Sequence, residues 1–258
     1  MGLFNFSLGE LETAMFIFFR VAAVLFFAPF FGSQQVPARL KIALALVFSV
    51  ALYPLVPAGA LSRPAGLFEL VVVVFTELTI GLAIAYAVQL IFAAVQLAGT
   101  VVDFQMGFGV VNVIDPQTQS QVPIAAQFHN IIAVLFFLAL NGHHVLIGAL
   151  VDSFELINPH RIDFSSLTPE FILQVFSATF IVAVKIAAPV MAVLFFLSVG
   201  LGLVARTVPQ MNVFIVGFPL QIGVGLVMIG LSMPFFSMIL KAQWAELPLR
   251  LRTLMGTF

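Results

Sequence analysis

The chain has 258 residues, of which 62% are hydrophobic and only 8% are charged, and its mean hydropathy is +1.18. A soluble domain of this length needs about a quarter of its residues to be charged, so the composition indicates an integral membrane protein. The formal net charge is −1 and no basic run is long enough to follow a phosphate backbone, which excludes nucleic-acid binding. Because there is no cysteine, disulfides, iron–sulfur clusters and thiolate chemistry are excluded as well.

Apolar runs separated by proline and glycine predict an all-α fold of about six long helices, arranged as hairpins. Several runs exceed the roughly 20 residues that one bilayer crossing needs, and the later runs contain internal prolines. Backbone groups freed at such breaks must be buried in protein or line a wet cavity. We therefore expect one membrane domain over residues 1–258 whose helices pack largely against protein neighbours. The predicted helices are 10–31, 37–57, 66–103, 123–150, 168–204 and 210–245.

Charges near the predicted helix ends give conflicting orientations. Arg39 and Lys41 place the first connection in the cytoplasm, whereas Lys241, Arg250 and Arg252 place the tail there. With six simple crossings the first connection and the tail lie on opposite sides of the membrane, so these two placements cannot both hold. Either the number of crossings differs from six or some hairpins do not cross.

No motif for nucleotide binding, a nucleophilic serine or a zinc site occurs in the chain. The pair of histidines in NGHH (141–144) points in directions about 100° apart on a helix, so it suits a polar helix end better than a metal. Asp103 and Asp115 are not placed opposite each other by any pattern. We expect no enzymatic activity, no cofactor and no metal site.

A few charges lie inside apolar runs, where each would cost about 2.5–3.5 kcal/mol at the centre of a bilayer. They could form a polar pathway or pair within an assembly. Pairing is favoured, because scattered charges make no relay. The charges predicted at helix or subunit contacts are Arg20, Glu77, Asp103, Lys185 and Arg206.

Residues 107–123, GFGVVNVIDPQTQSQVP, interrupt two of the most apolar stretches of the chain. Gly107 and Gly109 permit backbone conformations and close approaches that side chains forbid. Asp115 precedes Pro116, which favours an extended or turn geometry. A non-helical connection is therefore predicted here.

Bulky apolar side chains stand at the start of this connection, and an uncharged polar segment follows them. The bulky side chains of Phe104, Met106 and Phe108 come just before it. Its glutamines, if extended, would share one face and could hydrogen-bond to any peptide or to water. Such a segment suits the reversible closure of a pore, although an ordinary polar loop has the same composition. The alternating glutamines are Gln117, Gln119 and Gln121.

Four stretches carry a family resemblance: RVAAVLFFAPFFG (20–32), GTVVDFQMGFG (99–109) with Asp115-Pro116 beyond it, NGHH (141–144) and RTVPQMNVF (206–214). In this order they resemble the FliR family, which comprises the flagellar export-gate protein and its type III secretion counterparts. The resemblance covers essentially the whole chain.

The resemblance implies a FliP-like unit followed by a FliQ-like unit, present as one copy in a helical assembly with FliP and FliQ. FlhB would wrap the entrance of this assembly and FlhA would lie beneath it. Unfolded substrates would pass through its centre, in the bacterial inner membrane at the flagellar basal body, with parts raised to the periplasmic side. The resemblance also implies that loop 106–122 is a channel plug. The plug residues are Met106, Gly107, Phe108, Gly109, Val110, Asn112, Asp115, Pro116, Gln117, Gln119 and Gln121.

Three functions follow as hypotheses. The leading one is a non-enzymatic subunit of a protein export gate, in contact with membrane lipid and unfolded substrates. The second is a small-solute secondary transporter with broken helices, for which Glu77 and Asp103 are the best coupling groups. The third is a structural membrane subunit without contact to a pore.

Overall fold

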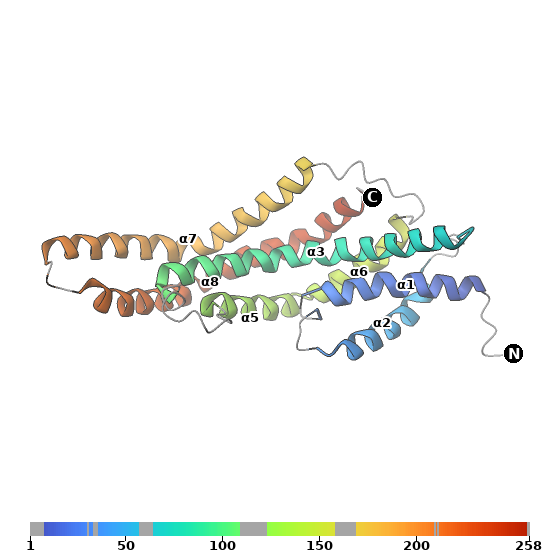
Figure 1. Cartoon of the computed structure of the whole chain (residues 1–258), viewed down its shortest axis with the longest axis horizontal. Coiled ribbons are helices and arrows are strands. Elements are labelled where there is room, and N and C mark those ends of the chain that lie inside the picture. The colour runs from blue at the N-terminus through green and yellow to red at the C-terminus, as the bar shows by residue number, and fades with distance from the viewer. Residues whose placement is uncertain are drawn as a thin grey trace. The chain divides into compact units, whose positions relative to one another are not determined.

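A computed structural model of the chain describes residues 8–29, 31–32, 36–56, 64–108, 123–157, 169–208, 210 and 212–256. Every regular element within these residues is a helix, so the predicted all-α fold is confirmed (Figure 1). The elements are α1 (Leu8–Phe27), α2 (Ala38–Leu52), the 3-10 helix η1 (Tyr53–Leu55), α3 (Leu67–Met106), α5 (Ile124–Ala139), α6 (Gly142–Leu156), α7 (Pro169–Thr207) and α8 (Val213–Met255).

The helix predicted over 123–150 is two helices, which makes seven α-helices in the described residues instead of six. Asn141 separates α5 from α6 because it adopts the left-handed conformation, with φ 56° and ψ 31°. Asparagine tolerates this region better than most residues do. The last helix runs on to Met255, past the predicted end at 245, so the basic tail belongs to the helix.

Among the residues that the structure describes, four helices (α2 with η1 counted as one) are long and apolar enough to cross a membrane, and α5 with α6 makes a fifth candidate if the pair is one broken span. The first helix is not among these candidates; it carries Glu10, Glu12 and Arg20. Helices α3, α7 and α8 contain 40, 39 and 43 residues. At 1.5 Å per residue each is about 60 Å long, twice the roughly 30 Å thickness of a bilayer's hydrocarbon core.

The chain divides into two compact units, each made from separate stretches of sequence. Unit 1 contains residues 1–90, 141–172 and 244–258. In this unit α1 packs on α2, and the buried face of α1 includes Phe16 and Ile17.

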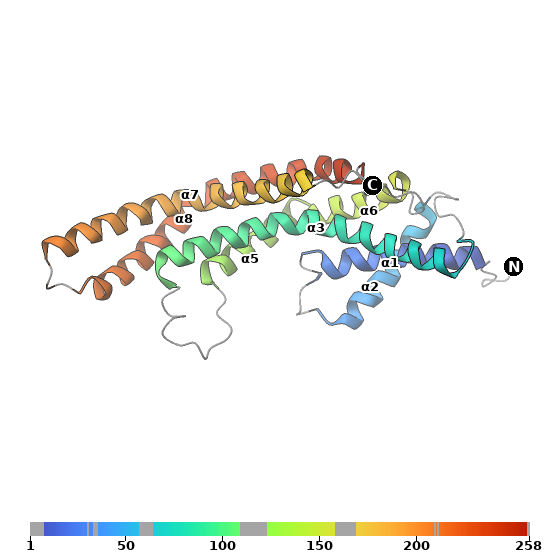
Figure 2. The same cartoon turned by 45° about the horizontal axis from the view of Figure 1, so that its top comes forward.

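Unit 2 contains residues 91–140 and 173–243, and in it α5 lies alongside the C-terminal part of α3 (Figure 2). The ring of Phe92 on α3 meets that of Phe137 on α5 edge-on, with centroids 5.9 Å apart. The ring of His129 on α5 meets that of Phe236 on α8 at 5.1 Å. Aromatic contacts between helices thus fix the core of this unit.

The left-handed residue between α5 and α6 gives a first prediction. Replacing Asn141 with Ala should lower the melting temperature of the purified chain in detergent by about 2–4 °C, since Ala lacks the short polar side chain that lets Asn adopt this conformation and should lose roughly 1 kcal/mol. Asn141→Gly, which adopts the same φ freely, is the control and should melt like the native chain. Equal melting temperatures for the Ala and Gly variants would contradict the assigned conformation.

Candidate functional site

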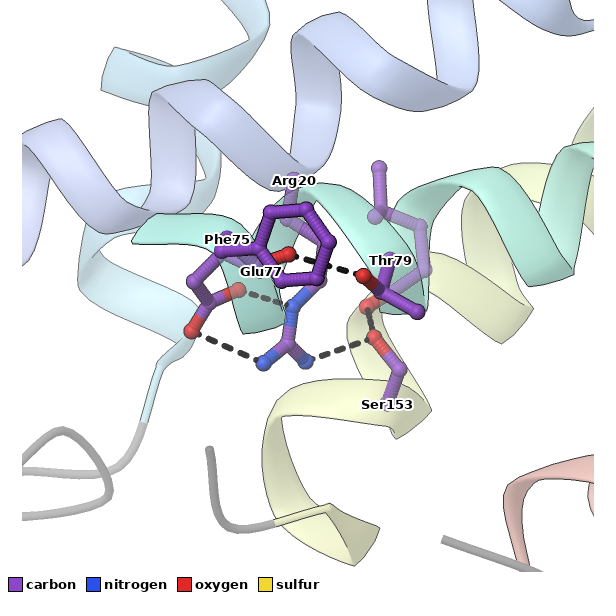
Figure 3. Close-up of polar contacts among 6 residues, drawn as sticks. Arg20, Phe75, Glu77, Thr79 and Ser153 are labelled. Atoms are coloured by element: carbon purple, nitrogen blue, oxygen red, sulfur yellow. Dashed lines mark hydrogen bonds and ion pairs between the residues drawn. The ribbon is translucent and has the colours of Figure 1, made fainter. Parts of the chain in front are cut away.

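A fully buried ion pair joins α1 to α3 in unit 1. Arg20 donates two parallel hydrogen bonds to the carboxylate of Glu77, from Nε to Oε2 and from Nη2 to Oε1, the second at 3.0 Å. Both side chains have 0% exposure. The remaining Nη1 donates to Oγ of Ser153 on α6 at 2.9 Å, so one guanidinium ties three helices together (Figure 3).

Local packing explains why these helices can come so close. At Gly81, one turn after Glu77, a Cβ would lie 2.7 Å from Cβ of Ala23 on α1, so only glycine permits this approach. The guanidinium carbon of Arg20 lies 4.1 Å from the ring centroid of Phe154, a cation–π contact. Ser153 Oγ donates to the carbonyl of Leu150 at 2.7 Å, which leaves its oxygen free to accept from the arginine.

A second buried carboxylate, that of Asp103, caps a helix. Its Oδ1 accepts from the backbone N–H of Ala125 at 3.0 Å and its Oδ2 from that of Ala126 at 3.2 Å. These are the second and third residues of α5, whose own N-cap, Pro123, offers no side-chain hydrogen bond. Asp103 therefore supplies the cap from the end of α3, where a negative charge also suits the helix dipole.

Further contacts hold the two ends of the 107–123 connection near one another. At Gly99 a Cβ would lie 2.6 Å from the backbone nitrogen of Ala126, so α3 and α5 touch backbone to backbone. Gly107 has φ +89°, which favours glycine, and a Cβ there would meet the ring of Phe218 on α8. We call residues 99–107 together with 123–126 the loop base.

Of the predicted plug residues, the structure describes only the first three. Met106 is buried, with 0% exposure, against Gly225 of α8, while Gly107 and Phe108 are partly exposed. Within the isolated chain Met106 thus lies in the loop base. The residues that lie outside the described part are Gly109, Val110, Asn112, Asp115, Pro116, Gln117, Gln119 and Gln121.

The predicted contact charges fall into two groups. Arg20 and Glu77 come together and Asp103 meets α5, all of them buried. Lys185 and Arg206 are exposed on α7, and neither makes an ion pair with any residue that the structure describes. A role of these two at subunit contacts stays a prediction.

The histidines of NGHH lie in the first turn of α6, with the ring centroids of His143 and His144 4.3 Å apart. In the described part of the chain no group of three or more His, Asp or Glu side chains could hold a metal ion.

The contacts that sequence reasoning missed are those of Ser153 and of the α5 amides. A serine inside an apolar helix and a cap supplied from 22 residues upstream leave no local sequence signal.

The chain matches the model of the family "Bacterial export proteins, family 1" over residues 11–247. It is 37% identical over 234 residues to the flagellar biosynthetic protein FliR of Bacillus subtilis (strain 168), with 88% of each chain covered. It is 31% identical to FliR of Escherichia coli (strain K12), covering 88% of this chain and 87% of the relative. FliR of Aquifex aeolicus (strain VF5) is 30% identical, with 92% and 91% covered.

The buried ion pair predicts a non-additive effect on stability. Arg20→Met alone should destabilise the chain by about 3–5 kcal/mol, because the buried carboxylate of Glu77 loses the guanidinium that neutralises it, while adding Glu77→Met should restore most of this loss. The measurement is thermal unfolding of the purified variants in detergent. Arg250→Met is the control, since its pair with Glu246 is exposed and worth less than about 1 kcal/mol. Additive losses in the double variant would contradict the pairing.

The cap on α5 predicts a local effect. In Asp103→Ala the amides of Ala125 and Ala126 should exchange hydrogen about tenfold faster, as a lost N-cap costs roughly 1–2 kcal/mol. Asp103→Asn, which keeps one oxygen acceptor, should give an intermediate rate. Asp152→Ala, a change at an exposed carboxylate, is the control. Unchanged exchange in Asp103→Ala would show that the cap is not formed in solution.

Proposed function

This chain belongs to the FliR family of bacterial export proteins and is a membrane component of flagellar export, and we propose that it forms part of the wall of the type III export gate. In this role it catalyses no reaction. It assembles with FliP and FliQ, as one copy, around a channel for unfolded substrates. FlhB and FlhA complete the entrance on the cytoplasmic side.

The lengths of the helices support an assembly with other subunits. Helices α3, α7 and α8 each exceed the thickness of a bilayer core about twofold, yet they are apolar along most of their length. Large apolar side chains stay exposed along α7 from Leu173 (68%) to Leu203 (62%), roughly 45 Å apart along the helix and so farther than one bilayer core. Lipid cannot cover an apolar face of this length, so protein neighbours must cover part of it. This is the observation that carries the proposal.

Within the assembly we assign loop 106–122 to the plug of the channel. The loop base supports this assignment, because Asp103, Gly99 and Gly107 hold the ends of a Gly- and Gln-rich connection against one rigid core. A plug needs such an anchor if its tip is to leave the channel and return. The bulky apolar residues at the start of the loop would close the channel by excluding water from it.

The alternative transporter function loses its best candidates for coupling. A coupling carboxylate must exchange its partner for a proton or ion during transport. Glu77 accepts hydrogen bonds from two nitrogens of Arg20, and Asp103 accepts them from two backbone amides. Cross-linking separates the third hypothesis, a structural subunit without contact to a pore, from the proposed function. A stalled export substrate should cross-link to residue 108 if the chain lines the channel, and should not if the chain lies away from it.

Deleting residues 109–121 tests the plug. The gate should still assemble, because the loop base is intact, but membranes containing it should leak small solutes. The measurement is solute efflux from cells or vesicles that carry the complete gate, compared with the undeleted gate at equal amounts. Replacing the same segment with a Gly/Ser stretch of equal length is the control for chain connectivity. A deleted gate that stays as tight as the intact one would remove the plug assignment.

A further inference from the structure

One charge stands alone on the exposed face of α7. Between residues 173 and 205 Lys185 is the only charged residue. It is exposed, and its neighbours on that face are also exposed and apolar, among them Ile181 (52%) and Val184 (59%). The opposite face, with Ile186 and Val190, is buried in unit 2. Lys185 thus points away from the core of its own chain.

The same turn of α7 carries a second polar group. Pro189 lies inside the helix and has no N–H, so the usual hydrogen bond to the carbonyl four residues earlier, that of Lys185, is missing. Lys185 therefore carries two polar groups: the ammonium of its side chain and a backbone carbonyl that lacks its usual hydrogen-bond donor in the helix. In lipid both are costly, which is why such groups in membrane helices are normally covered by protein or water.

Lipid headgroups cannot provide this cover for the helix as a whole. If Lys185 lay at headgroup level, the apolar arm over 186–205, about 30 Å long, could cross the core. The arm over 173–184 would then extend out of the core with Leu173 (68%) and Phe180 (57%) exposed to water. If Lys185 lay deeper, no phosphate would reach it. Either position requires a protein neighbour on this face.

We propose that Lys185 and the turn ending at Pro189 form the site where α7 binds an acidic side chain on a helix of another gate subunit. The proposal rests on the proposed function, which supplies the neighbouring subunit. A carboxylate neutralises the ammonium, and an apolar helix around it covers the face that Ile181, Val184 and Ala188 present. The pair would select one register of the partner helix, since a shifted helix would leave both charges unpaired in an apolar contact.

The test uses the full chain co-expressed with FliP and FliQ of the same organism and purified through a tag on this chain. Lys185→Met removes the charge but suits an apolar helix face, so the chain itself should still fold and insert. We expect Lys185→Met and Lys185→Glu to lower the amount of co-purified partner per chain by about tenfold or more, because the carboxylate is left unpaired. Lys185→Arg should retain most of it.

Lys241→Met is the matched control, since Lys241 is an exposed lysine in the more polar end of α8. It should leave the ratio of partner to chain unchanged. Equal ratios for native, Lys185→Met and Lys185→Glu chains would overturn the proposed site. If the native chain fails to bring down either partner, the proposed function itself fails, so the two failures are distinguishable.

A photoreactive residue at position 185 identifies what lies against the turn. An adduct on a partner peptide that contains Asp or Glu supports the proposal, and an adduct on lipid alone overturns it. Changing that acid to Lys should then restore assembly of the Lys185→Glu chain but not of the Lys185→Met chain. Restoration of both, or of neither, would contradict a specific charge pair.

Discussion

The helices of this protein are too long for the membrane that must hold them, and most of its architecture follows from that mismatch. Helices α3 and α7 are about 60 Å long and apolar along most of their length, so they cannot lie wholly in a 30 Å core and cannot stand in water either. Part of each apolar face has to be covered by protein. A chain built in this way needs protein neighbours, and the export gate proposed for it would supply them.

The charged residues divide according to this constraint. Arg20, Glu77 and Asp103 are buried and satisfied inside the chain, where they tie α1 to α3 and cap α5. They stabilise the subunit before any partner arrives. Lys185 is left on an exposed face that the chain does not cover. The first group holds the subunit together, and the second is available to other subunits.

Much of the fold was predictable from sequence, because hydrophobic runs and prolines are local signals. The all-α class, the apolar helices and the approximate ends of α3 and α5 on either side of residues 109–122 follow from them. The break at Asn141 was predictable only in part, since the polar stretch NGHH indicates a helix end, whereas the left-handed conformation of Asn141 leaves no sequence signal of its own. The pairing of Arg20 with Glu77 and the cap from Asp103 join residues 57 and 22 positions apart, so only the packing of the helices reveals them. The plug itself comes from the family resemblance together with the composition of the loop.

The most direct measurement of the central claim is the accessibility of α7 to lipid in the isolated chain and in the assembled gate. The chain has no cysteine, so single cysteines can be placed on exposed positions that span roughly 39 Å of α7, for example at Leu173, Val184 and Val199, and spin-labelled. Collisions with oxygen dissolved in the lipid then report contact with acyl chains. Labels that are accessible in the isolated chain should become protected on assembly along a stretch longer than one bilayer core. A face that stays equally open to lipid in the assembled gate would contradict the account.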